Sequence, residues 1–222
     1  HDEARHFYVM HDYLAQIGPV PDKLVPGAER VLAGTLSADT LAKKLIGMQL
    51  MIEPMALTLF QVVRESQLEP VLCELLNYYE RDEARHVALG VLHLPKLLNR
   101  LSLAEAADLW TWQCREFWAQ FGMLRDLEKH LVALGIRPVD VVELGRGKQL
   151  RANQMMLDEL GYDLPVQNLF LRLFNMKAAW DFPNNVPRHD LGARMQHALK
   201  AGFRGNETDA ELYVDPRGAA AK

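Results

Sequence analysis

Several features are scarce or absent in this 222-residue chain, and each absence excludes a class of protein. The two cysteines, Cys73 and Cys114, form no CxxC pair, which excludes a disulfide framework and a rubredoxin-type metal knuckle. We expect both to be reduced thiols of a cytoplasmic protein. The formal net charge of -4 provides no basic surface for nucleic acid. No run of 18 or more apolar residues occurs, so we expect no membrane span.

Strand-like alternation is also missing, and apolar residues instead recur at helical spacing along most of the chain. The segment 17–36 is rich in proline and glycine, so we expect it to be a long connection without a helix of its own. The polar segment 204–222 is expected to be a flexible tail. The chain is therefore predicted to be all-α. The expected helices cover residues 1–16, 37–66, 70–100, 102–134, 138–160, 166–179 and 190–201.

The sequence Asp-Glu-Ala-Arg-His occurs twice, beginning at Asp2 and again at Asp82. Residues three apart in a helix lie on one face, so Glu3 would project beside His6, and Glu83 beside His86. A carboxylate and an imidazole are good ligands for divalent iron or manganese. A single pair of this kind is usually a solvated surface pair, but a five-residue repeat favours a shared metal site.

The remaining residues of the two motifs are candidates for orienting the ligands. A metal-bound histidine normally donates its second ring N–H to a carboxylate. We predict that Asp82 orients His6 and that Asp2 orients His86, in an approximately two-fold arrangement. The interspersed arginines, Arg5 and Arg85, can pair with these aspartates. Tyr79 is either a redox-active or hydrogen-bonding neighbour of the site or an aromatic residue of the core.

One further carboxylate, Glu53, is the only acid between Asp39 and Glu65 and lies in an otherwise apolar helix. It is therefore a candidate third metal-binding carboxylate, although it could also turn outward or pair with a buried arginine. Pro54 follows it and lacks a backbone N–H, which predicts a kink or bulge beside Glu53.

Two Glu-x-x-His helices with an isolated glutamate on a helix between them resemble the ferritin-like dinuclear-iron carboxylate superfamily. The resemblance covers about residues 1–100, and the motif is similar to those of its desaturases, N-oxygenases and reductase small subunits. It implies a four-helix bundle whose metal ligands are Glu3, His6, Glu53, Glu83 and His86. That family takes one more carboxylate from a first helix, so we expect a helix before residue 1 that this chain does not include. Glu80 is the nearest candidate within the chain, and we expect it to flank the site.

The resemblance implies an oxidase or oxygenase with two iron ions, or with manganese or a mixed Mn/Fe pair. We expect residues 1–100 to form the metal-binding bundle and residues 101–203 to form additional helices packed on it. The expected partners are O2, a small apolar organic substrate and a separate electron-donor reductase, with no nucleic acid and no membrane. A homodimer is also considered. Two alternatives stay open: a ferritin-like iron-binding ferroxidase and a metal-free helical interaction protein.

Overall fold

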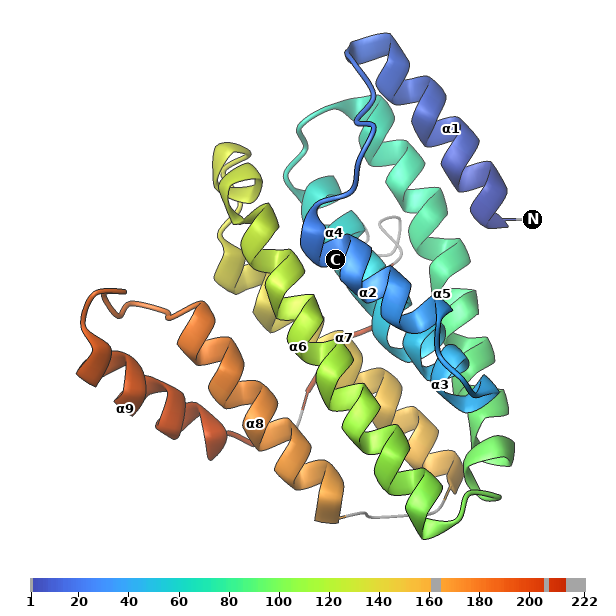
Figure 1. The fold of residues 1–222 in the computed structure, drawn as a ribbon. Helices are drawn as coiled ribbons and strands as arrows, with labels where there is room; N and C mark the ends of the chain where they lie inside the picture. The colour runs from blue at the N-terminus through green and yellow to red at the C-terminus, as the bar shows by residue number, and fades with distance from the viewer. Residues whose placement is uncertain (1, 161–164, 206–207, 215–222) are drawn as a thin grey trace.

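The computed structural model describes residues 2–160, 165–205 and 208–214, and within these ranges the ordered elements are all helical. The all-α prediction is therefore confirmed. Figure 1 shows long helices that run side by side, with α1 along one flank and the α8–α9 pair along the other. The helices in chain order are α1 (Asp2–Ile17), α2 (Pro26–Leu36), α3 (Leu41–Leu45), a π-helical segment (Ile46–Ile52), α4 (Glu53–Glu65), α5 (Pro70–Leu98), α6 (Leu103–Ala133), α7 (Pro138–Leu160), α8 (Pro165–Asp181) and α9 (Leu191–Gly202).

Local side-chain chemistry sets several of the helix boundaries. Pro70 occupies the first turn of α5, where its missing N–H costs no hydrogen bond. Ser102 and Glu105 form the predicted capping box at the start of α6, in which each side chain accepts from the other residue's backbone N–H. The Asp190 side chain caps α9 by accepting from the N–H of Ala193.

The expectation that residues 17–36 form a connection without a helix is wrong, because Pro26–Leu36 is helix α2. Its proline lies in the first turn, where proline is compatible with a helix. Gly27 and Gly34 allow α2 to pack closely on α6, since a side chain at Gly27 would collide with the backbone of Met123. These residues reflect helix–helix packing and not an open loop.

The irregularity predicted beside Glu53 is present as the π-helical segment Ile46–Ile52, which joins α3 to α4. Pro54 cannot donate a backbone hydrogen bond to the preceding turn, so backbone carbonyls near it need other donors. The carbonyl of Met51 accepts a hydrogen bond from Gln120 Nε2 at 3.0 Å, and Gln149 donates in turn to Gln120. Buried amides from α6 and α7 thus stabilise the irregular turn that precedes Glu53.

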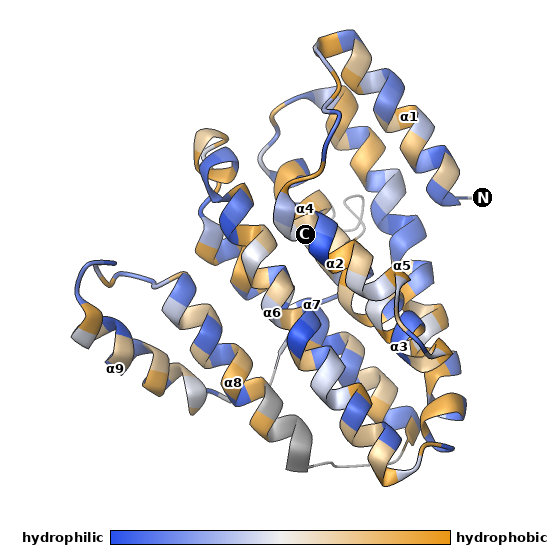
Figure 2. Cartoon of the chain, viewed as in Figure 1, coloured by the Kyte–Doolittle hydropathy of each residue, from blue (hydrophilic) through white to orange (hydrophobic). Residues whose placement is uncertain are grey.

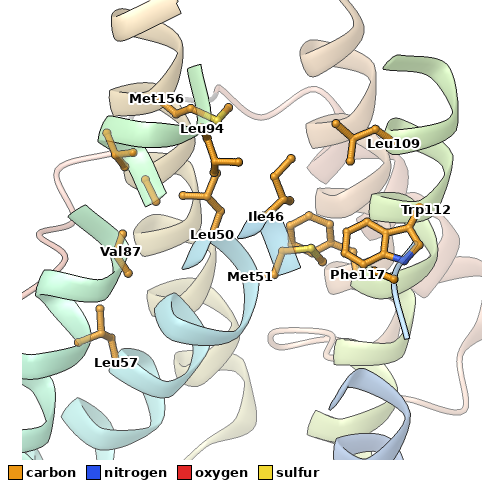
Figure 3. Close-up of a cluster of buried hydrophobic side chains, with 13 residues drawn as sticks. Ile46, Leu50, Met51, Leu57, Val87, Leu94, Leu109, Trp112, Phe117 and Met156 are labelled. Atoms are coloured by element: carbon orange, nitrogen blue, oxygen red, sulfur yellow. The ribbon is translucent and has the colours of Figure 1, made fainter. Parts of the chain in front are cut away.

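The hydrophobic core lies where α4 and the π-helical segment pack against α5, α6 and α7. Figure 3 shows Leu50 and Leu57 facing Val87 and Leu94 of α5, with Trp112 and Phe117 of α6 close to Met51. Burial of side chains of this size stabilises the fold by about 1.5–3 kcal/mol each relative to exposure. The core therefore fixes α4 and α5, the two helices that carry Glu53 and Glu83.

The helical stretch Leu41–Glu65 is long and apolar enough to cross a membrane by length and composition alone. Half of its most apolar window is buried inside the fold, and it carries the buried carboxylate of Glu53. It packs against both α5 and α7. Figure 2 shows hydrophilic and hydrophobic residues interspersed along the labelled helices, and not one uniformly apolar element.

One described part of the predicted tail, residues 208–214, lies against α7. Lys148 Nζ donates to the carbonyls of Glu211 and Leu212, at 3.1 and 2.6 Å. Gly147 leaves the space that Ala210 occupies, because a Cβ at Gly147 would lie 2.7 Å from the Ala210 Cβ. This stretch is non-helical, but it is held at defined points on the bundle and does not extend freely into solvent.

Candidate metal centre

The two repeated motifs and the isolated glutamate meet at one point between α1, α4 and α5. Glu3, Glu53, Glu83 and His86 each place one potential ligand atom within 4.8 Å of the others. Glu53 and Glu83 are only 5% and 3% exposed, whereas the side chain of Glu3 is 63% exposed. The cluster therefore has a buried floor from α4 and α5 and an open side at the start of α1.

Both histidines direct the same ring nitrogen toward this cluster. His86 Nδ1 lies 2.8 Å from Glu83 Oε2 and 3.1 Å from Glu3 Oε1. His6 Nδ1 lies 3.2 Å from Glu83 Oε1. The spacing within each Glu-x-x-His motif and the approach of α1 to α5 therefore bring two imidazoles to the same carboxylates.

The second nitrogen of His6 contacts an aspartate, as the motif predicts. His6 Nε2 lies 3.0 Å from Asp82 Oδ2, and Arg5 donates to the same oxygen at 2.5 Å. Arg85 also pairs with Asp82. Although burial acts in the opposite direction, hydrogen bonds from His6 and Arg5 lower the pKa of Asp82. Asp82 is therefore an anionic acceptor that fixes the His6 ring and keeps Nδ1 directed at the cluster.

The corresponding contact in the other motif is weaker. Asp2 Oδ2 lies 3.7 Å from His86 Nε2, beyond hydrogen-bond length, and Asp2 also accepts from Arg5. The side chain of Asp2 is 34% exposed, compared with 10% for Asp82. The aspartate of each motif therefore faces the histidine of the other motif, as an approximate two-fold arrangement requires. The two contacts differ in length, however, and His6 is the better oriented of the two histidines.

The buried carboxylates Glu53 and Glu83 share one site. Burial and the adjacent Glu83 carboxyl raise the pKa of Glu53 to about 10, and the Glu3 charge adds to the effect. Like-charged groups this close disfavour ionisation of the pair. A divalent cation would relieve this repulsion. Both the charge of the cluster and the type of its donor atoms therefore suit a metal ion.

Tyr79 is a hydrogen-bonding neighbour of the cluster. Its hydroxyl donates to the backbone carbonyl of His6 at 2.8 Å, and its ring stacks on the His6 ring with centroids 4.1 Å apart. Tyr79 is 5% exposed. It therefore supports the position of α1 and the plane of the His6 ring at the same time.

Glu80, which was expected to flank the site, pairs with an arginine of α4. Arg64 donates to both Glu80 oxygens, from Nε at 2.8 Å and from Nη2 at 3.1 Å. Glu80 has no exposed surface and Arg64 is 9% exposed. Glu80 is thus half of a buried ion pair between α4 and α5 and does not belong to the carboxylate cluster. Sequence reasoning could not identify this pair, since Arg64 carries no motif.

The apolar residues near the motifs pack as core and do not line an open pocket. Leu50, Leu57 and Val87 are at most 1% exposed and belong to the main hydrophobic cluster. Gly90 makes no room for a substrate, because a Cβ at this position would overlap the side chain of Gln49. Close packing of α5 on the π-helical segment therefore explains the glycine. His93, two turns beyond His86, is exposed and lies outside the cluster.

The donor set comprises carboxylate oxygens and imidazole nitrogens, which suit iron, manganese or zinc. Glu3, Glu53, Glu83, His6 and His86 are the described residues that could hold such ions. Comparisons of the chain with models of protein families, with curated proteins and with solved structures find no match. Any assignment of function therefore depends on the geometry of the cluster.

Proposed function

We propose that this protein is a non-haem dinuclear-metal oxidoreductase of ferritin-like architecture that uses O2 to oxidise a small organic substrate. The observation that supports the proposal is the convergence of Glu3, Glu53, Glu83 and two histidine Nδ1 atoms on one point. Two iron ions, or manganese in one or both positions, would activate O2 when bound. A separate reductase would supply electrons.

The chain's own residues have distinct tasks in this proposal. Glu53 and Glu83 provide carboxylates from α4 and α5, the helices that the hydrophobic core holds in place. Asp82 holds His6 and thereby keeps Nδ1 available for a metal ion. Substrate and metal would approach from the side of Glu3, the exposed member of the cluster.

Two paired substitutions test the ligand assignment. His86→Ala should abolish dinuclear Fe(II) binding, because it removes the nitrogen 2.8 Å from Glu83. His93→Ala is the matched control: it removes an exposed histidine from the same helix and should leave binding unchanged. Equal Fe(II) binding by both variants, measured by anaerobic titration, would remove His86 from the site.

Exposure to O2 separates an oxygenase from an iron-storage protein. The Fe(II)-loaded protein should consume O2 and, when supplied with a reductant and an accepted organic compound, yield oxidised product detectable by mass spectrometry. Rapid turnover of added Fe(II) alone into a ferric mineral would instead identify a ferroxidase and contradict the oxygenase proposal.

A further inference from the structure

A second site lies on the flank opposite α1. A cavity of about 660 Å³ opens between α7, α8 and α9. In Figure 1 the α8–α9 pair and α1 lie on opposite sides of the bundle, so this cavity is separate from the carboxylate cluster. Its volume is within the range of small-molecule sites, about 300–1,000 Å³.

A buried guanidinium lines the cavity. Arg146 is 6% exposed, and its hydrogen bonds in the described residues go to neutral acceptors. Nε donates to Asn175 Oδ1 at 2.6 Å and Nη2 donates to the carbonyl of Gly205 at 2.7 Å. Burial and the nearby charge of Arg204 lower the pKa of Arg146, although the charge of Glu143 acts in the opposite direction. Buried charges in proteins are normally compensated by an opposite charge, and among the described residues no carboxylate forms an ion pair with this guanidinium.

The same cavity contains an unused buried donor. Asn175 is 3% exposed, and its Nδ2 atom has no hydrogen-bond partner in the described part of the chain. Its Oδ1 atom is already engaged by Arg146, so the orientation of the amide is fixed. An unpaired buried amide is unfavourable, and a ligand acceptor in the cavity would satisfy it.

The charge balance of the lining is positive. Lys200 and Arg204 of the α9 region join Arg146, whereas Glu143 is the acidic residue among the lining side chains. Glu143 is already paired with Arg204, at 2.7 Å. The remaining positive charge favours an anionic ligand, and guanidinium groups are well suited to carboxylates.

Other buried residues that line the cavity are apolar. Val142, Ala178 and Phe182 line it and are 6%, 6% and 3% exposed. A small inorganic anion would leave this surface without contacts. An organic acid with an apolar body would contact both the polar and the apolar residues of the lining.

We infer that the cavity between α7, α8 and α9 binds a small organic carboxylate, with its acid group between Arg146 and Asn175 and its apolar body against Val142, Ala178 and Phe182. This binding site goes beyond the proposed metal-dependent oxidation and does not depend on it. Octanoate is a suitable probe because it combines a carboxylate with a flexible apolar chain.

Calorimetric titration of the metal-free full chain with octanoate tests the inference. One octanoate should bind per chain, and Arg146→Gln should weaken binding about tenfold or more, as expected for loss of a charge-assisted hydrogen bond. The double variant Lys200→Gln/Arg204→Gln changes only exposed side chains and should also weaken binding, even if Arg146→Gln fails to fold. Arg151→Gln removes an exposed charge from α7 outside the cavity and should have no effect.

Two further ligands separate the alternatives. 1-Octanol should bind much more weakly than octanoate, since it lacks the charge, and inorganic phosphate should also bind weakly, since it lacks the apolar body. Equal binding of octanol and octanoate, binding of phosphate in preference to octanoate, or octanoate binding that no cavity variant changes would each overturn the inference.

Discussion

Asp82 accepts a hydrogen bond from His6 across the interface of α1 and α5, with Nε2 and Oδ2 3.0 Å apart. The two residues belong to different copies of the same five-residue motif. Each motif therefore supplies a candidate ligand together with a carboxylate that can orient the other motif's histidine. Asp2 likewise faces the histidine of the other motif, but the distance from its Oδ2 to His86 Nε2 is longer, at 3.7 Å.

This inequality predicts different effects of two equivalent substitutions. Asp82→Asn should weaken Fe(II) binding about 10–100-fold, because it removes the anionic acceptor that fixes His6. Asp2→Asn should weaken it less, since Asp2 is more exposed and makes no hydrogen bond to His86. Equilibrium titration of both variants measures the difference. Equal losses would show that the shorter contact has no special role.

Because Glu80 pairs with Arg64 and lies outside the metal cluster, its substitution should destabilise the fold without removing a metal ligand. Glu80→Ala would leave the Arg64 guanidinium buried without its counter-charge, at a cost of about 3–5 kcal/mol in the free energy of unfolding. Urea denaturation of the metal-free protein measures this cost. Folded Glu80→Ala should still bind metal ions normally, and an unchanged unfolding free energy would contradict the structural role of Glu80.

Gly90 predicts a packing defect. Gly90→Ala should destabilise the fold by about 1–3 kcal/mol, because the new methyl group overlaps Gln49 of the π-helical segment. Gly18→Ala is the matched control, since its Cβ would have no atom within 4 Å. Thermal unfolding compares the two. A Gly90→Ala variant as stable as the parent would mean that α5 and the π-helical segment do not pack this closely.

Lys148 predicts a dependence of stability on pH. Burial lowers the pKa of Lys148 from 10.5 to about 8. Between these values the unfolded chain holds more protons on this lysine than the folded chain does, so the contribution of Lys148 to the free energy of unfolding should rise with pH. The shift corresponds to about 3 kcal/mol over this range.

Variants isolate the lysine from other groups that titrate over the same range. Lys148→Met should lose this rise, whereas Lys129→Met, at an exposed position of α6, should keep it. Urea denaturation at pH 8 and pH 10.5 measures the slope. The same slope in Lys148→Met as in the parent would assign the effect to another group.

Much of the fold was predictable because its signals are local. Helical spacing, the capping box at Ser102 and the first-turn proline at Pro70 each depend on a few neighbouring residues. Helix α2 was missed for the same reason. Pro26, Gly27 and Gly34 read locally as a connection, but their fit to α6 is a tertiary contact that spacing along the chain does not reveal.

The candidate centre was predictable to the extent that the motif encodes it. The repeat and the isolation of Glu53 indicated which residues would meet, and the proline indicated the irregular turn beside Glu53. The pairing of Glu80 with Arg64 and the cavity around Arg146 were not predictable, because they join residues from distant helices and leave no repeated pattern.

The proposed function requires that the carboxylate cluster bind two metal ions. The direct measurement is the amount of iron bound per chain after anaerobic loading and removal of free metal, by elemental analysis. We expect two irons per chain for the parent protein and for Glu74→Ala, a control at an exposed position of α5, and none for Glu83→Ala. A parent protein that retains no iron, or a Glu83→Ala variant that retains two, would contradict the proposed dinuclear centre.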